Sequence, residues 1–436
     1  MTSTEYKKYH ELFMQNNHGS TAVHTFLCIF FTVQCTIYIS IKQRFPKCCQ
    51  YVYEYLVLVL PMIIAHTVLP EYIHNLNLIA SVILLFNLLF SYQNLYKKFM
   101  QQNVFHNDRL ALISCLRGLT YLITGLCILA VDFKDFPRYL AKTERFGYSL
   151  MDTGVGLFVI VSGLVHKDLH KESLGKVITG NVKIIFILFV LGVGRFVSVK
   201  QLDYQEHVTE YGVHWNFFFT IAVCKIISTI LLYFSDRTLL LCIVTSVVHE
   251  FTLFFGLQDW VFGVSPRDSL ISANREGISS SLGYVAIYLY GVHIKSVLLN
   301  KKVTKFQTQI LLVSETIIVW CLMYFVDLVR PTSRTLANLG YCLYTDTLLI
   351  SMTTVLYFAT VLYEHKDVYF KVPLLLSHIN KNGLSYFLIA NLLTGAVNLS
   401  MRTLLVPSIL TFVILNIHMI VTLRLLFCLN FLGIRI

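Results

Sequence analysis

Long apolar runs recur along the whole chain, and short polar segments separate them. A membrane-spanning helix needs about 20 mostly apolar residues, and thirteen segments approach this length. They lie near 22–41, 51–68, 76–92, 111–131, 149–165, 178–198, 213–234, 238–256, 280–299, 307–326, 337–362, 384–404 and 407–431. A backbone in lipid must satisfy its own hydrogen bonds, and the alternating pattern of a membrane barrel is absent from the sequence. We therefore predict an all-α, polytopic integral membrane protein that forms one domain, 1–436.

The basic residues between these runs predict the orientation of the chain. The loops after odd-numbered spans hold more Lys and Arg than those after even-numbered spans. Cytosolic loops usually carry this excess, so we predict a cytosolic C-terminus and a short N-terminal segment, 1–21, in a lumen or outside. The loop after the fourth span departs from the rule, because it places Lys134, Arg138, Lys142 and Arg145 on the non-cytosolic side. A loop that keeps its charges against this rule is a candidate for chemistry.

Composition agrees with a membrane location and narrows the function. The 436 residues are 56% hydrophobic and 14% charged, whereas soluble proteins are about 25% charged. The net charge of +11 comes from clusters such as Lys97-Lys98 and Lys301-Lys302 at the borders of apolar runs. Such clusters orient the chain and attract anionic lipids, so we predict no nucleic-acid partner. Most of the eleven cysteines lie inside apolar runs and show no metal-ligand spacing, so we predict no metal.

Four loops, all after even-numbered spans, hold a high density of acids, bases and imidazoles. They cover 130–156, 204–216, 265–284 and 330–341, and the predicted topology brings them to the same side. A hydroxyl nucleophile needs a base such as a carboxylate or histidine, and a developing oxyanion needs a donor such as Lys or Arg. The loops therefore predict a polar active site or a transport vestibule.

Particular residues in these loops are candidates for binding. Glu206 and Glu210 are four residues apart, so they would line one stripe if the segment is helical. Asn274, Arg275 and Glu276 precede Gly277, where a ligand could approach the backbone. Arginine also binds phosphate well. The alternative for each of these residues is an ordinary solvated or ion-paired side chain.

Charged residues inside the apolar runs deserve a separate reading, because burial in hydrocarbon is costly. Arg117, Arg195, Lys225 and the pair His249-Glu250 occupy such positions. For Lys225, snorkelling or pairing inside the bundle is the favoured reading. His249-Glu250 fits function and structural hydrogen bonding equally well.

The sequence lacks several enzyme signatures. It contains no His followed five positions later by Asp, so the motif of soluble-type glycerolipid acyltransferases is absent. It also contains no P-loop, no GxSxG elbow and no HExxH motif.

Five blocks of the chain resemble the signature blocks of one enzyme family. They are AVDFKDFPRYLAKTERFGYSLMDTGVG, YQEHVTEYGVHWNFFFT, ISANREGISSSLGYVAIYL, SRTLANLGY and INKNGLSYFLIANLLTGAVNLSMRT. They look like blocks of the GPI-anchor inositol acyltransferases, which include animal phosphatidylinositol-glycan class W proteins and the fungal GPI-anchored wall transfer protein. The N-terminal piece YKKYHELFMQNNHGST matches less well, so no role is transferred to it.

The resemblance implies an endoplasmic reticulum enzyme with thirteen spans and lumenal active-site loops. It implies transfer of a fatty acyl chain, typically palmitoyl, from acyl-CoA to the inositol 2-hydroxyl of glucosaminyl-phosphatidylinositol. The family's acid and amine fall on Asp132 and Lys142, which we therefore expect to be catalytic. We expect acyl-CoA as co-substrate, no bound cofactor, contact with membrane lipids and no obligate protein partner. The remaining candidates for substrate binding are Arg138, Arg195, Glu206, His207, His214, Trp215, Asn216, His249, Asn274, Arg275 and Glu276.

Three rival functions stay open at the level of the sequence. A lipid transporter or flippase would also need polar loops, although inverted repeats and interrupted helices are typical of transporters. A membrane-bound O-acyltransferase could use His249 as its base. A non-enzymatic scaffold is disfavoured by the density of acid and base groups. Asn398-Leu399-Ser400 is a formal glycosylation sequon, which we expect to lie too close to the membrane to be used.

Overall fold

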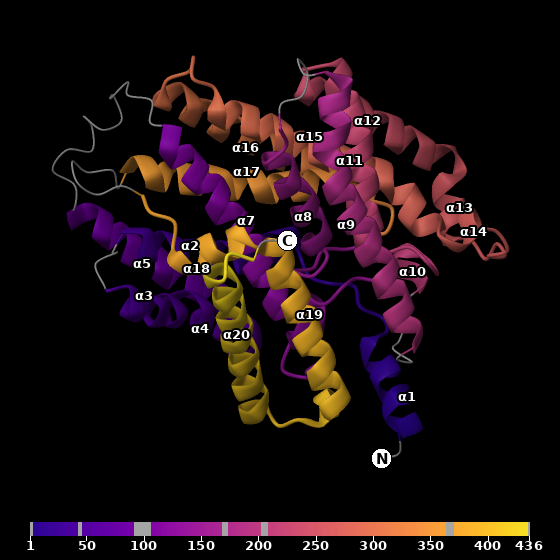
Figure 1. Ribbon diagram of the computed structural model, residues 1–436, viewed down its shortest axis with the longest axis horizontal. Helices are drawn as coiled ribbons and strands as arrows, with labels where there is room; N and C mark the ends of the chain where they lie inside the picture. Colours follow the sequence, from indigo (N-terminus) through magenta and orange to yellow (C-terminus); the bar gives the residue numbers. More distant parts are fainter. Residues whose placement is uncertain are drawn as a thin grey trace.

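The computed structural model is a bundle of helices (Figure 1) and describes residues 3–41, 46–90, 106–167, 173–201, 208–362 and 370–434. In this part of the chain, twelve helices are long and apolar enough to cross a membrane. Three of them are composite: α3 (Lys47–Glu54), η1 (Tyr55–Val59), α4 (Leu60–Ile63) and η2 (Ile64–Val68) form one, η3 (Pro70–Tyr72) and α5 (Ile73–Phe90) form the second, and α12 (Thr238–Thr252), η6 (Leu253–Leu257) and α13 (Gln258–Phe262) form the third. The other nine are α2 (Ala22–Ile41), α7 (His106–Ala130), α9 (Leu174–Gln201), α11 (Phe217–Phe234), α15 (Arg275–Leu299), α16 (Lys305–Val329), α17 (Leu339–Leu362), α19 (Gly383–Ser400) and α20 (Ser408–Phe431). The prediction of an all-α polytopic membrane protein is confirmed.

The fifth predicted span, 149–165, is shorter than the sequence indicated. Its helix, α8, covers Thr153–Leu164 and has 12 residues, about 18 Å of helix against a hydrocarbon core of about 30 Å. A side chain on Gly163 would come within 2.2 Å of the Tyr288 carbonyl oxygen in α15. Small residues permit this close helix crossing. α8 is therefore enclosed by other helices rather than bounded by lipid.

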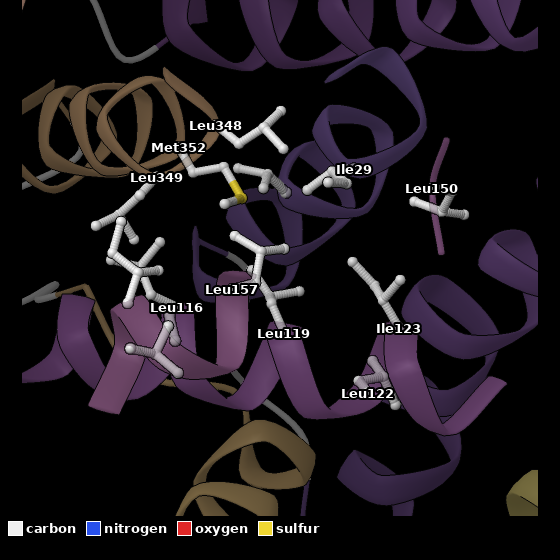
Figure 2. Close-up of a cluster of buried hydrophobic side chains, with 14 of the residues drawn as sticks. Ile29, Leu116, Leu119, Leu122, Ile123, Leu150, Leu157, Leu348, Leu349 and Met352 are labelled. Atoms are coloured by element: carbon white, nitrogen blue, oxygen red, sulfur yellow. The ribbon is translucent and has the colours of Figure 1, made fainter. Parts of the chain in front are cut away.

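The core of the bundle is formed where α2, α7, α8 and α17 meet. Figure 2 shows Ile29 from α2, Leu119 from α7, Leu157 from α8 and Met352 from α17 gathered in one apolar cluster. α17 is the most buried of the long helices, whereas α5 and α9 expose most of their length. Exposed side chains on these outer helices, such as Phe86 and Phe186, are apolar, as a lipid-facing surface requires.

Several shorter elements were not predicted from apolar length. They are α1 (Ser3–Met14), η3 (Pro70–Tyr72), η5 (Arg138–Leu140), α10 (Val208–Tyr211), α14 (Leu270–Ala273), α18 (Leu374–Lys381) and η7 (Thr403–Leu405). The predicted span 238–256 also continues further, because the chain kinks at Gly256, where φ is +107°, and resumes as α13. Glycine adopts this backbone conformation without strain.

The four polar loops predicted to share one side do meet. Glu210 accepts hydrogen bonds from Lys142 and Arg334, which joins the loops before α8, α11 and α17. The His214 backbone donates to the Asn274 side chain, which adds the loop before α15. The C-terminal end of α19, which lies beside α20 in Figure 1, reaches the same end through Asn398.

Candidate active site

The loop between α7 and α8 is held by buried side chains, although most of it is irregular. Phe133 and Phe136 are fully buried and anchor its first half. The buried Asp152 carboxylate organises the second half, because Oδ2 accepts hydrogen bonds from Thr143 N (3.1 Å), Thr143 Oγ1 (2.7 Å) and Ser149 Oγ (2.8 Å). Charge-assisted hydrogen bonds of this kind are stronger than neutral ones. The loop can therefore hold side chains in fixed positions.

Arg334 joins this loop to its neighbours. Its Nε donates to Asp152 Oδ1 (2.8 Å), and its Nη1 lies 3.4 Å from Glu210 Oε1. Burial alone would lower the pKa of Arg334, but the carboxylates of Glu210 and Asp152 outweigh burial and raise it. The guanidinium thus remains charged and paired in the interior.

Lys142 forms an ion pair with Glu210 at 2.7 Å and keeps 41% of its side chain exposed. Burial would raise the pKa of Glu210, but Lys142, Arg334 and Arg195 together lower it to about 2. Glu210 is therefore ionised at neutral pH and is a poor candidate for a general base. Lys142 has a fixed counter-ion and an open side for a ligand.

Asp132 lies at the start of the same loop, is 5% exposed and accepts a hydrogen bond from Asn398 Nδ2 at 2.7 Å. Burial raises the pKa of Asp132, and the Asn398 bond and the charges of His10 and Lys142 offset part of this rise. The predicted partners Asp132 and Lys142 therefore sense one another electrostatically, although the ion pair of Lys142 is with Glu210. A carboxyl group whose pKa is raised by burial is suited to proton transfer near neutral pH.

The N-terminal segment, to which no role was assigned from its sequence, contacts this loop directly. Arg138 Nη2 donates to the Met14 carbonyl oxygen at 3.0 Å, and its guanidinium lies over the Phe13 ring. Asn17 Nδ2 donates to the carbonyl oxygens of Ala141 (2.8 Å) and Lys142 (2.9 Å). Arg138, predicted to bind substrate, is thus engaged in holding α1.

Residues 273–277, with the sequence ANREG, hold neighbouring segments together. Asn274 Oδ1 accepts from the backbone of His214 (2.8 Å) and Trp215 (2.9 Å). Arg275 donates to two carbonyl oxygens, those of Gly263 (2.7 Å) and Ser265 (3.1 Å). The side chains of Asn274 and Arg275, predicted to bind substrate, therefore bond backbone groups of neighbouring loops.

Other candidates near this block also have internal partners. Glu276 pairs with Arg267 at 2.5 Å. We predicted that a ligand could approach the backbone at Gly277. In the structure the Trp215 indole occupies the space beside this glycine. Asn216 caps α11 by accepting from Phe218 N at 3.1 Å, a role typical of asparagine before a helix.

His249 and Glu250 support the segment that carries Arg334. His249 Nε2 donates to the Leu336 carbonyl oxygen at 2.9 Å, and the residue is 1% exposed. Glu250 pairs with Arg330 and accepts from Leu339 N at 2.8 Å. The observed partners of His249 and Glu250 therefore favour structural hydrogen bonding over a direct role in function.

The remaining candidates lie at the edge of the site or outside it. Arg195 on α9 is exposed, and its charge acts on Glu210. The His214 ring packs edge-on against Phe196 with ring centroids 5.1 Å apart. Glu206 and His207 fall outside the residues that the structure describes.

A small cavity of about 220 Å³ opens beside the loop of Asp132. Its wall combines hydroxyl groups, one carboxylate and two apolar side chains, from Thr67, Val68, Asp135, Ser408, Thr411 and Phe412. Asp132 itself is not among the residues that line this cavity.

Several residues that hold the candidate site together were not singled out from the sequence. Asp152 and Arg334 stood in the quoted blocks only as loop charges, and Asn398 only as a sequon. The signal that could have identified Asp152 and Arg334 was the presence of charged residues in several loops that were predicted to meet on one side. Together the residues offer a carboxylate to take a proton from a hydroxyl and an ammonium to stabilise an oxyanion.

Comparison with known proteins finds relatives across eukaryotes. The model of the GWT1 family matches residues 6–429. A phosphatidylinositol-glycan biosynthesis class W protein of Dictyostelium discoideum is 30% identical over 99% of both chains. GPI-anchored wall transfer protein 1 of Schizosaccharomyces pombe is 36% identical over 70% of this chain and 68% of its own. The human glucosaminyl-phosphatidylinositol-acyltransferase PIGW is 28% identical over 95% of both chains.

Proposed function

This chain belongs to the GWT1 family, and we propose that it transfers a palmitoyl chain from acyl-CoA to the inositol 2-hydroxyl of glucosaminyl-phosphatidylinositol, an early step of GPI-anchor biosynthesis. Relatives from mouse, cattle and human are named as acyltransferases of this glycolipid. The observation that carries the proposal is the buried carboxylate of Asp132 within the electrostatic reach of Lys142. A hydroxyl-to-thioester transfer needs these two kinds of group.

The proposed reaction uses Asp132 as base and Lys142 as electrostatic stabiliser. Asp132 accepts the proton of the inositol 2-hydroxyl while that oxygen attacks the thioester carbonyl carbon. The Lys142 ammonium, paired with Glu210, stabilises the negative charge on the carbonyl oxygen. The C–O ester bond forms, the C–S bond breaks, and CoA leaves as a thiolate. The proton taken by Asp132 then passes to this thiolate, giving free CoA thiol and the acylated lipid.

We further propose an endoplasmic reticulum location with the site in the lumen, a lumenal N-terminus and a cytosolic C-terminus. The excess of Lys and Arg in the odd-numbered loops supports this orientation. The gathering of the even-numbered loops at one end supports a single lumenal site. Arg195 is an exposed cation whose charge acts on Glu210, so we assign it to the phosphate groups of the substrates.

The test of the proposed function is acyl transfer by the purified protein. The protein in detergent is mixed with palmitoyl-CoA and glucosaminyl-phosphatidylinositol, and the lipid is analysed by mass spectrometry. We expect a product heavier by one palmitoyl group and one equivalent of free CoA thiol. Movement of the glycolipid across proteoliposomes without any acylated product would instead identify a flippase.

His249→Gln separates the proposed base from the alternative base. Glutamine can place an amide N–H near the position of His249 Nε2, so the bond to Leu336 can persist, but an amide cannot accept the reaction's proton. We expect turnover within about tenfold of wild type, well short of the loss caused by removing a general base. Loss of all turnover in a folded His249→Gln protein would move the role of base from Asp132 to His249.

A further inference from the structure

Asn398 connects the end of α19 to the candidate catalytic loop. Its Nδ2 donates to Asp132 Oδ2 at 2.7 Å, across 266 positions of sequence. Its Oδ1 is buried and accepts no hydrogen bond from the residues that the structure describes. The orientation of this amide is therefore set by Asp132, because reversing it would direct the amide oxygen at the carboxylate.

The second carboxylate oxygen of Asp132 is left available by this arrangement. Within the described parts of the chain, Oδ1 of Asp132 accepts no hydrogen bond. Turning the carboxylate plane away from Asn398 Nδ2 would break the Asn398 bond, whereas a half-turn only exchanges two equivalent oxygens. The amide thus selects one orientation of the group that must meet the substrate hydroxyl, and a base acts efficiently only when its geometry is fixed.

The same asparagine is the first residue of the sequon Asn398-Leu399-Ser400. Leu399 and Ser400 are exposed, and Ser400 Oγ donates to the Val397 carbonyl oxygen within the same helix end. A glycan would be attached to Nδ2, the atom that bonds Asp132. Positioning of Asp132 and glycosylation therefore compete for one atom.

We propose that Asn398 is a positioning residue for acyl transfer, which holds the Asp132 carboxylate toward the inositol hydroxyl, and that its sequon is not glycosylated. This inference rests on the proposed function, because it presumes that Asp132 is the base. Asn398 acts through Asp132 and needs no contact with substrate. The role of the amide is to fix the orientation of the carboxylate and to favour its ionised form.

The charged groups that face Asp132 are His10 of α1 and Lys142 of its own loop, with Lys134 and Asp135 nearby in sequence. The Asn398 bond stabilises the ionised carboxylate and so lowers the pKa of Asp132, which burial raises. Removing the amide should therefore raise the pKa of Asp132 further. Because the base works only when ionised, the acidic limb of the pH profile should move to higher pH.

The experiment compares Asn398→Leu with Ser400→Ala, since both abolish the sequon and only the first removes the amide. kcat/KM for acyl transfer is measured from pH 5 to 9 with the purified protein. In Asn398→Leu we expect the acidic limb to move up by about one pH unit, with about tenfold lower kcat/KM below it. Ser400→Ala should keep the wild-type profile. Asn398→Asp places a second acid beside Asp132 and should move the limb further still.

Two results would overturn the inference. One is an equal loss at every pH with an unmoved acidic limb, because that loss would report a purely structural role. The other is a glycan on Asn398 of the active wild-type protein, detected by mass spectrometry. If Asp132→Asn itself retains turnover, the proposed base is wrong; if Asp132→Asn is inactive and the limb of Asn398→Leu is unmoved, the role of Asn398 alone is wrong.

Discussion

Asp132→Asn should lower the turnover of acyl transfer by about 10²–10⁴-fold without unfolding the protein, because it removes a general base and keeps the side-chain shape. An asparagine at this position can still accept from Asn398 Nδ2, so the contact between α19 and the loop is retained. Turnover is measured with saturating palmitoyl-CoA and glycolipid, and folding is measured by thermal unfolding in the same detergent. Lys142→Ala should also lower turnover, because the oxyanion loses its cation.

Asp135→Asn is the matched control for this prediction. It makes the same chemical change three positions away in the same loop, at a carboxyl group that lines the small cavity. We expect Asp135→Asn to keep turnover within about tenfold of wild type. Near-normal turnover in both Asp132→Asn and Lys142→Ala, at normal protein levels, would show that the reaction does not use this pair.

The acid dependence of the reaction should carry the signature of the same carboxyl group. Burial raises the pKa of Asp132, and a base with a raised pKa loses its ionised form earlier as pH falls. Turnover should therefore decline on the acidic side at a pH above the ordinary range of aspartate. Glu210 cannot produce this limb, because its pKa is held at about 2.

The sequence predicted most of the fold because a long apolar helix can be recognised from the composition of a single continuous segment. The span at 22–41 coincides with α2, and the end of the span at 337–362 coincides with the end of α17. α8 was overestimated, because residues 149–152 form the turn around Asp152 rather than the start of a helix. α1 was missed because it is too polar to meet a rule based on crossing a membrane.

The site was predictable only in part, because its pairings are long-range. Asp132 and Lys142 could be named from a resemblance, but Arg334 and Asp152 lie 182 positions apart. Glu210 and Lys142 lie 68 positions apart, and no local pattern marks either ion pair. Such partners follow from the packing of helices, which single-sequence periodicity does not encode.

The charged groups of the site form two sets: one set holds the loops in place, and the other is available to substrates. Buried groups such as Arg275, Glu276 and Arg334 have internal partners and fix the loops. Lys142 and Arg195 keep exposed surface, and Asp132 keeps one carboxylate oxygen without a hydrogen bond among the described residues. A fixed frame around a few available groups is the arrangement that electrostatic catalysis requires, because the groups need not reorganise during the reaction.

Arg334→Met should destabilise the protein by about 3–5 kcal/mol, because it leaves the buried Asp152 and the partly buried Glu210 without their shared cation. Arg334→Lys should be intermediate, since one ammonium cannot reproduce a guanidinium that contacts two carboxylates. Thermal unfolding in detergent measures both effects, and Arg334→Met should melt about 5–10 °C below wild type. Turnover should fall as well, because Glu210 and Lys142 lose their position.

Arg145→Met is the control for loss of an arginine from the same end of the bundle. Arg145 is exposed and packs over the Phe262 ring, so its removal should cost about 1 kcal/mol or less. Adding Asp152→Asn to Arg334→Met should recover part of the lost stability, because it removes one of the unpaired buried charges. If Arg334→Met has the same melting temperature as the wild-type protein, the two carboxylates do not depend on Arg334. The loops around Lys142 must then be held by other contacts.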